Sequence, residues 1–183
     1  MWSEASTRSG RQAAAIHDDG SGDVGPRLAE FVACQRRAGR RVSGLVMEYR
    51  DQAPGRRRAM ILIDVELGTE YPVSQALGTG SGTCQLDPRG FADASAVLRD
   101  ALRRAPDLVV CNRYGALEAG GDGFAQELLA LMAAGIPVLT VVADPHVVAW
   151  QEFSGHAPVL PPDPEAWLAW LCAVLAQERS NAG

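Results

Sequence analysis

Two nearly uninterrupted apolar runs limit most strongly the folds that this sequence can adopt: Asp107–Cys111 (DLVVC) and Ile136–Ala143 (IPVLTVVA). Short apolar runs of this kind are typical of strands in a parallel sheet that is covered on both faces. A shorter apolar run at 12–16 and several segments with helical spacing alternate with them along the chain. The alternation predicts an α/β fold with three layers, in which helices cover both faces of a mostly parallel sheet.

The expected elements follow from this pattern. We expect strands at 12–16, 42–49, 59–67 with a short extension through 73, 107–111 and 136–143, and an edge strand near Val159. We expect helices at 26–39, 91–104, 124–134, 144–153 and 163–179. The strands at 42–49 and 59–67 flank an exposed turn, which predicts a β-hairpin insertion. We expect residues 12–179 to form one domain after a disordered tail at 1–11.

Charge and hydropathy exclude several classes of protein. The net charge of −5 argues against a protein that coats nucleic acid. No apolar run approaches the length of about 18 residues that a membrane span needs, and the first residues contain no apolar core of a signal peptide. The four cysteines form no C-x-x-C pair, so neither a zinc site nor a redox pair is indicated. We therefore expect a cytoplasmic protein.

The loop after the first expected strand has an incomplete phosphate-binding pattern. Gly20 and Gly25 have the spacing of G-x-x-x-x-G-K-[ST], but Pro26 and Arg27 stand where the motif needs Lys and then Ser or Thr. All 17 basic residues of the chain are arginines, so no lysine elsewhere can take over the role of the motif's lysine. Hydrolysis of a nucleoside triphosphate at this loop is therefore not expected.

Other polar loops are expected at the same edge of the sheet, because ligands of open α/β sheets bind outside the carboxyl ends of the strands. These loops are a Gly-rich segment at 78–87, the segment 112–123 and the turn at 143–146. A helix that starts at Pro26 would offer unpaired N–H groups, glycines would allow close backbone approach, and Arg113 would supply forked donors. The candidate ligand-binding residues are Gly20, Ser21, Gly22, Gly25, Arg27, Gly80, Ser81, Gly82, Thr83, Cys84, Asn112 and Arg113.

The roles of several side chains near these loops can each be interpreted in two ways. The three aspartates Asp18, Asp19 and Asp23 oppose anion binding unless they face away or bind a cation. Cys84 either packs inward or serves as a nucleophilic thiol. Glu118 is the best candidate for an acid, and its alternative role is a cap or ion pair for the following helix.

The order of motifs resembles the P-loop nucleoside-triphosphatases of the nucleotide kinase-related type. The resemblance rests on four stretches of this sequence: Val42-Ser43-Gly44-Leu45, Ile63 to Glu70, Cys111 to Glu118, and Pro137 to Val142. It implies a P-loop-like fold. In the third stretch Asn112 and Arg113 replace the family's acidic pair, which the resemblance implies would organise magnesium and water.

More closely, the span from Ala14 to Trp170 resembles an uncharacterised bacterial family encoded beside molybdate-transport operons. Its members share N-R-[FY]-G and a G-x-G-S-G-x-C loop, matched here by Asn112 to Gly115 and by Gly78 to Cys84. The resemblance implies a link to molybdenum handling, with molybdate or tungstate as ligands and components of molybdate transport or molybdoenzymes as partners.

The sequence thus favours a non-catalytic protein that binds a small oxyanion or a nucleotide through a degenerate P-loop, and magnesium-bound nucleotide is the less favoured ligand. Two alternatives remain open. One is a residual nucleoside-triphosphatase that uses Arg27 or a residue of a partner, and the other is a scaffold or regulatory subunit with a vestigial pocket.

Overall fold

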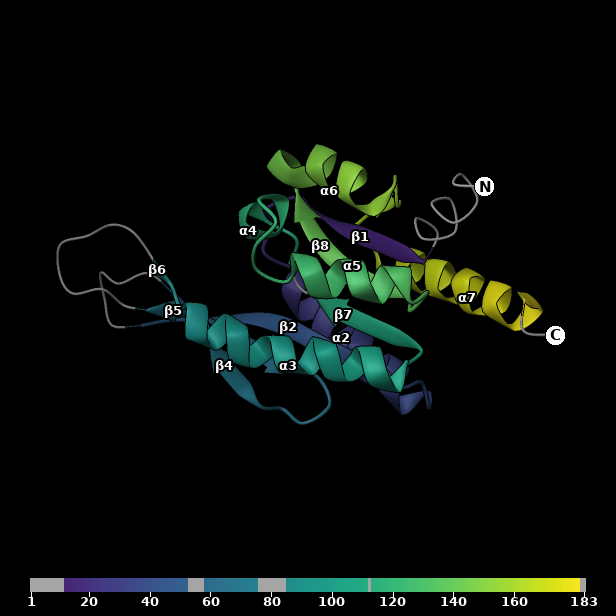
Figure 1. Cartoon of the computed structure of the whole chain (residues 1–183), viewed down its shortest axis with the longest axis horizontal. Coiled ribbons are helices and arrows are strands. Elements are labelled where there is room, and N and C mark those ends of the chain that lie inside the picture. Colours follow the sequence, from purple (N-terminus) through teal and green to yellow (C-terminus); the bar gives the residue numbers. More distant parts are fainter. Residues whose placement is uncertain (1–11, 53–57, 76–84, 112, 182–183) are drawn as a thin grey trace.

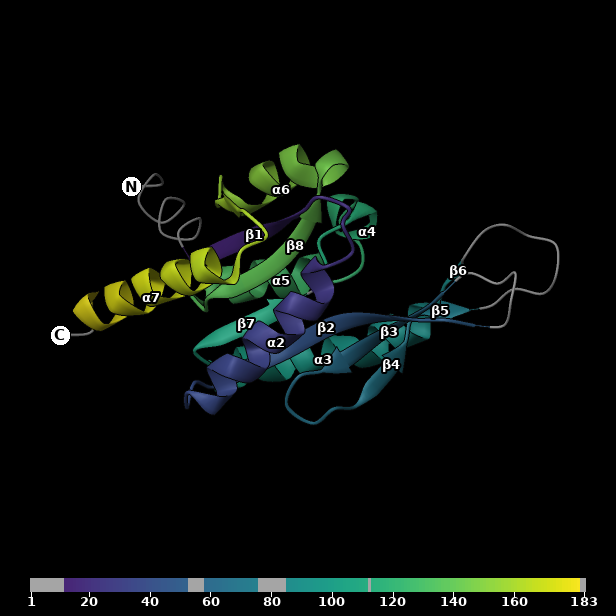
Figure 2. The same ribbon diagram turned by 180° about the vertical axis from the view of Figure 1, so that it is seen from behind.

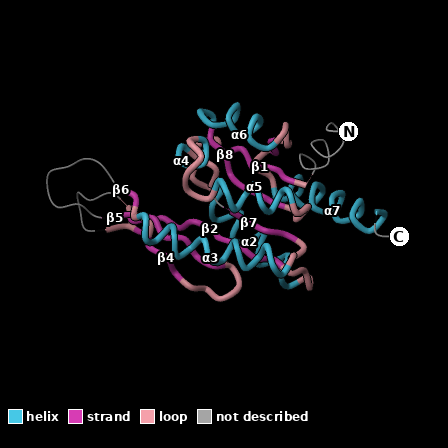
Figure 3. The backbone as a smooth tube through the Cα atoms, viewed as in Figure 1, coloured by secondary structure: helices cyan, strands magenta, loops and turns pink. Residues whose placement is uncertain are grey.

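The computed structural model of the protein describes residues 12–52, 58–75, 85–111 and 113–181. The strands are β1 (Ala13–Asp18), β2 (Val42–Arg50), β3 (Ala59–Asp64), β4 (Glu70–Pro72), β5 (Ser74–Gln75), β6 (Gln85–Leu86), β7 (Leu108–Cys111), β8 (Val138–Ala143) and β9 (Val159–Leu160). The helices are α2 (Val24–Arg37), α3 (Pro88–Arg104), α4 (Ala116–Ala119), α5 (Ala125–Ala133), α6 (Val147–Ser154), which follows the 3-10 turn η1 (Asp144–His146), and α7 (Pro164–Asn181). Figure 3 shows these elements along the backbone.

The main sheet has seven strands in the order β4-β3-β2-β7-β8-β1-β9. The five strands from β2 to β9 pair in parallel, and β3 and β4 add an antiparallel edge. The predicted α/β fold with a mostly parallel sheet is confirmed, and so is the β-hairpin, in which Leu45 pairs with Asp64 and Arg50 with Ala59. The short strands β5 and β6 form a second, two-stranded sheet at the end of this hairpin (Figure 1).

Helices cover both faces of the main sheet. The helices α3, α5 and α6 lie on the face seen in Figure 1, and α2 and α7 lie on the opposite face, seen in Figure 2. Successive residues of β1 point to opposite faces, so Ala13 and Ala15 belong to the core under α3 and α5, whereas Ala14 and Ile16 belong to the core under α2 and α7. Burial on both sides explains why this strand is apolar at every position up to His17.

The first helix begins earlier than the sequence predicts. Helix α2 starts at Val24, so Gly25 lies within its first turn and Pro26 is the third helical residue rather than the first. Proline is tolerated there because the N–H groups of the first turn have no partner within the helix. The loop between β1 and α2 is correspondingly shorter than the predicted loop at 17–25.

Local hydrogen bonds move other boundaries as well. Helix α3 starts at Pro88 rather than 91, because the Asp87 carboxylate accepts a hydrogen bond from the backbone N–H of Arg89 and caps the helix. Strand β3 ends at Asp64 rather than 67, because the Asp64 carboxylate accepts hydrogen bonds from the backbone N–H groups of Glu66 and Leu67. The expected loop at 112–123 contains the short helix α4.

Gly44 allows β2 and β7 to approach each other closely. Its φ is +119°, and a Cβ at this position would lie 2.0 Å from the carbonyl oxygen of Val110. Only glycine fits this position without a shift of the backbone. Among the described helices, none is long and apolar enough to cross a membrane.

Candidate functional site

The loop from β1 to α2 folds on its own side chains at the carboxyl edge of the sheet. The Asp18 carboxylate accepts a hydrogen bond from the N–H of Gly20 at 3.0 Å, and the Asp19 carboxylate accepts one from the N–H of Ser21 at 2.9 Å. The backbone N–H and the hydroxyl of Ser21 lower the pKa of Asp19. Gly20 and Gly22 have φ angles of +79° and +82°, which explains the glycines at these two positions.

The backbone N–H groups at the start of α2 receive no hydrogen bond from a capping side chain. Asp23 is the N-cap residue, but its side chain makes no capping hydrogen bond to the first turn. The N–H groups of Val24 and Gly25 therefore receive no cap from Asp23, and they lie at the positive end of the helix dipole. This geometry favours an anion near the first turn of α2.

Arg113 faces this loop from the end of β7. Its Nη2 lies 2.7 Å from Oδ2 of Asp18, in a pair whose side chains are 35% and 14% exposed. The Nε of Arg113 is buried and has no hydrogen-bond partner among the described residues. The guanidinium group therefore uses one side of its donor fork on an internal carboxylate and leaves a second donor unused.

The turn after β8 also reaches this edge. The Nε2 of His17 lies 2.5 Å from Oδ1 of Asp144, which is the first residue of η1. The carboxyl ends of β1, β7 and β8 thus converge, as parallel pairing requires. Asp18 meets Arg113, the second residue after β7, and His17 meets Asp144, the first residue after β8. Within the described part of the chain, no group of three His, Cys, Asp or Glu side chains is arranged to hold a metal ion.

Arg27 is engaged away from the loop's glycines. Its Nη1 donates a hydrogen bond to the carbonyl oxygen of Pro162 at 3.0 Å, and its Nη2 lies 3.7 Å from Oδ2 of Asp23. The structure therefore brings Gly20, Ser21, Gly22, Gly25 and Arg113 to one edge and ties Arg27 to the segment before α7. Six candidate ligand-binding residues lie outside the described residues: Gly80, Ser81, Gly82, Thr83, Cys84 and Asn112.

Glu118 lies in α4 and is 5% exposed. Its two carboxylate oxygens accept hydrogen bonds from the backbone N–H groups of Gly115, at 3.0 Å, and Phe124, at 3.1 Å. These bonds close the segment between β7 and α5 around the carboxylate. The structure thus gives Glu118 a capping function, and its role as an acid stays a prediction.

The sequence analysis left open whether Asp18 opposes an anion, faces away or binds a cation, and it did not pair Asp18 with Arg113. The two residues are far apart in the chain, and β8 lies between their strands in the sheet. The available signal was that each lies two residues after an apolar run, at strand ends that a parallel sheet brings to one edge.

A parallel strand between two parallel neighbours (β1), followed by a glycine-containing loop and then a helix at the carboxyl edge, is the arrangement of a P-loop-like α/β fold. The model of a family described as "Protein of unknown function (DUF2478)" matches residues 13–170, and the chain belongs to this family. The chain is also 39% identical over 133 residues to the protein of Bradyrhizobium diazoefficiens named Molybdenum import ATP-binding protein ModC 2. That match covers 73% of this chain and 15% of the relative's length.

Proposed function

We propose that this protein binds a small anion, either a tetrahedral oxyanion or the phosphate of a nucleotide, at the carboxyl edge of the sheet and does not hydrolyse it. The observation that carries the proposal is the position of Arg113. Its guanidinium group faces the glycine-containing loop in front of α2 and already holds one oxyanion, the carboxylate of Asp18.

The internal carboxylate suggests how a ligand would bind. Asp18 engages Nη2 of Arg113, while the Nε donor of the same fork has no partner among the described residues. A tetrahedral oxyanion that displaces Asp18 could accept hydrogen bonds from both donors, which is the bidentate geometry that arginine favours. In this proposal Asp18 is a competitor that ligand binding must displace.

The absence of hydrolysis follows from residue chemistry. Pro26 stands at the lysine position of the P-loop motif, and Arg27 at the position of the hydroxyl that holds magnesium. Arg27 is tied to Pro162, so it does not replace the missing lysine in this conformation. The similarity to a relative named as a molybdenum import ATP-binding protein supports molybdate or tungstate as the ligand and molybdate-transport or molybdoenzyme components as partners.

Titration calorimetry at fixed ionic strength tests the proposal with molybdate, tungstate, sulfate, phosphate, ATP and GTP, each with and without magnesium. Arg113→Ala is expected to weaken binding about ten- to a hundredfold, because a hydrogen bond to a charged group contributes about 1.5–3 kcal/mol. Asp18→Asn is expected to tighten binding, because it removes the competing charge. Arg50→Ala is the matched control, since Arg50 pairs with exposed Glu48 and Glu70 on the β-hairpin.

Two results would replace this function with an alternative. If none of these anions binds the wild-type protein at millimolar concentration, the scaffold or regulatory hypothesis takes its place. If magnesium-dependent ATP turnover is found and Arg27→Ala abolishes it, the protein is a residual nucleoside-triphosphatase.

A further inference from the structure

A second concave site lies at the opposite edge of the main sheet. A cavity of about 660 Å³ opens where α2 ends, β2 begins and α3 ends. Because α2 has 14 residues with a rise of about 1.5 Å each, this cavity is about 20 Å from the loop at the start of α2. Five arginines line it: Arg36, Arg37, Arg40, Arg41 and Arg104.

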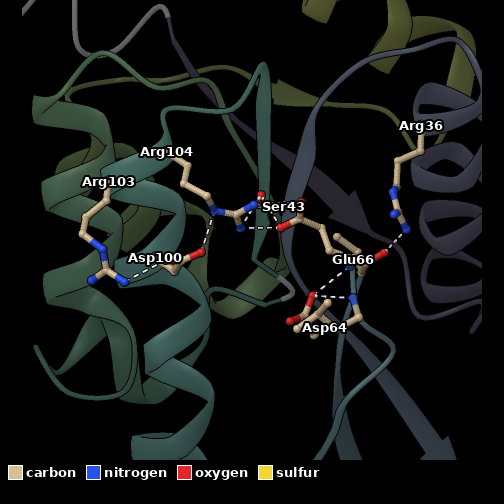
Figure 4. A network of polar contacts seen from close by, with 9 residues as sticks. Arg36, Ser43, Asp64, Glu66, Asp100, Arg103 and Arg104 are labelled. Carbon is tan, nitrogen blue, oxygen red and sulfur yellow. Dashed lines mark hydrogen bonds and ion pairs between the residues drawn. The ribbon is translucent and has the colours of Figure 1, made fainter.

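Two of these arginines are neutralised by carboxylates. Arg104 Nη2 lies 2.5 Å from Oε2 of Glu66, and Arg41 Nη2 lies 2.9 Å from Oδ1 of Asp107. Arg104 also pairs with Asp100 one turn earlier in α3 (Figure 4). Glu66 is the one acidic residue among those that line the cavity.

The other three arginines form no ion pair with a described carboxylate. Arg36 donates a hydrogen bond to the carbonyl oxygen of Val65, and Arg40 donates one to the side-chain oxygen of Gln35. Arg37 makes neither kind of contact among the described residues. Arg36 also acts electrostatically on the carboxylate of Glu66, and Arg40 on that of Asp107. The five arginines thus face the carboxylates of Glu66, Asp100 and Asp107, which leaves an excess of positive charge around the cavity in a chain whose net charge is −5.

Hydrogen bonds hold Glu66 in place, and its single charge cannot neutralise all of the arginines around the cavity. It accepts hydrogen bonds from the Ser43 hydroxyl at 2.8 Å and from the Arg104 guanidinium (Figure 4). The hydrogen bond from Arg104 lowers the pKa of Glu66. The Asp64 carboxylate fixes the turn by accepting from the N–H of Glu66 at 2.7 Å.

Helix capping does not account for the whole cluster. Arginines in the last turn of a helix interact favourably with its carbonyl groups, which is sufficient for Arg36, Arg37 and Arg104. Arg40 and Arg41 follow the end of α2 and line the cavity beyond it. The run Arg36-Arg37-Ala38-Gly39-Arg40-Arg41 thus frames the cavity from two sides of the turn at Gly39.

We propose that this cavity is a second binding site, which takes a polyvalent phosphate anion such as the diphosphate or triphosphate group of a small molecule. Its volume is within the range of small-ligand pockets, about 300–1,000 Å³. Guanidinium groups bind phosphate oxygens through paired donors and stay charged at every physiological pH. A concave site with an excess of positive charge suits a compact ligand with several negative charges better than a flat protein surface.

Calorimetry with pyrophosphate as the probe, on the full chain and at low and physiological ionic strength, tests this site. Arg37→Gln is the decisive variant, because Arg37 has no described partner and its loss should leave the fold intact. We expect Arg37→Gln to weaken pyrophosphate binding about tenfold or more. The combined variant Arg37→Gln/Arg40→Gln should weaken it further, and Arg50→Gln, with the same change of charge far from the cavity, should not.

The outcomes separate this proposal from the function proposed above. Wild-type binding that falls with Arg37→Gln and not with Arg50→Gln supports the cavity. Binding that falls with Arg113→Ala and not with Arg37→Gln overturns the cavity and supports the carboxyl-edge site. Equal losses with Arg37→Gln and Arg50→Gln show a general charge effect and overturn the cavity, as does the absence of binding at millimolar pyrophosphate.

Discussion

Replacing Glu118 by glutamine tests whether this buried carboxylate holds the segment between β7 and α5. Each of its two oxygens accepts one backbone hydrogen bond, from Gly115 and from Phe124. Glutamine has the same shape but only one accepting oxygen, so one backbone N–H would face the amide NH₂ group. Hydrogen bonds to charged groups contribute about 1.5–3 kcal/mol each, and a buried donor left without a partner costs about 1–3 kcal/mol.

We therefore expect Glu118→Gln to lower the free energy of unfolding by about 2–3 kcal/mol, and Glu118→Ala, which loses both bonds, by about 3–5 kcal/mol. Urea denaturation followed by circular dichroism measures both losses, with an unchanged m-value as the check that the two-state treatment holds. Glu30→Gln on the exposed face of α2 is the matched control and should change stability by about 0.5 kcal/mol or less.

A loss below about 0.5 kcal/mol for Glu118→Gln would refute this reasoning, because surface substitutions reach that value without any specific contact. Such a result would leave the carboxylate free for the acid role that the sequence suggested. A glutamate kept only as an acid would tolerate the isosteric amide without loss of stability.

Three further predictions concern other residues. Gly44→Ala should lower the free energy of unfolding by more than about 3 kcal/mol in thermal or urea unfolding, because the new Cβ would clash with the Val110 carbonyl oxygen. Gly39→Ala is the control: its φ is +85° but the space around it is open, so it should cost only about 1 kcal/mol. Because Arg104 lowers the folded-state pKa of Glu66 below 4.5, the stabilisation from this pair is complete above that pH and is lost as pH falls through the folded pKa. The difference in unfolding free energy between wild type and Glu66→Gln should therefore shrink from pH 7 toward pH 3, and a constant difference would contradict the pair's role. Phosphate-release assays should find no ATP or GTP hydrolysis above background, with or without magnesium.

The fold class was predictable because its signals are local. The runs at 107–111 and 136–143 became β7 and β8 at the centre of the sheet, where both faces are buried. The β-hairpin was predictable for the same reason, since alternation and a turn are properties of neighbouring residues. The predicted start of α2 was wrong by two residues, because the sequence did not reveal that Asp23 would occupy the N-cap position.

Only part of the candidate site could be predicted from the sequence. The glycines of the first loop and Arg113 were identifiable from residue type and from their positions after apolar strands. The bond between Asp18 and Arg113 was not, because it depends on the order of strands in the sheet, and that order is set by crossovers that leave no local pattern. The capping role of Glu118 was among the interpretations of the sequence, because its partners Gly115 and Phe124 are close to it in the chain.

The sequence by itself determined that strands and helices alternate, that no lysine is present, and that Pro26 and Arg27 follow the glycine spacing of the first loop. Only the tertiary structure decided which charges meet. It paired Asp18 with Arg113 at one edge, and at the other it placed Glu66 and Arg104 against the arginines that follow α2. Hydrophobic periodicity is encoded within a few residues, whereas the energy of an ion pair depends on distances that exist only after the chain has packed.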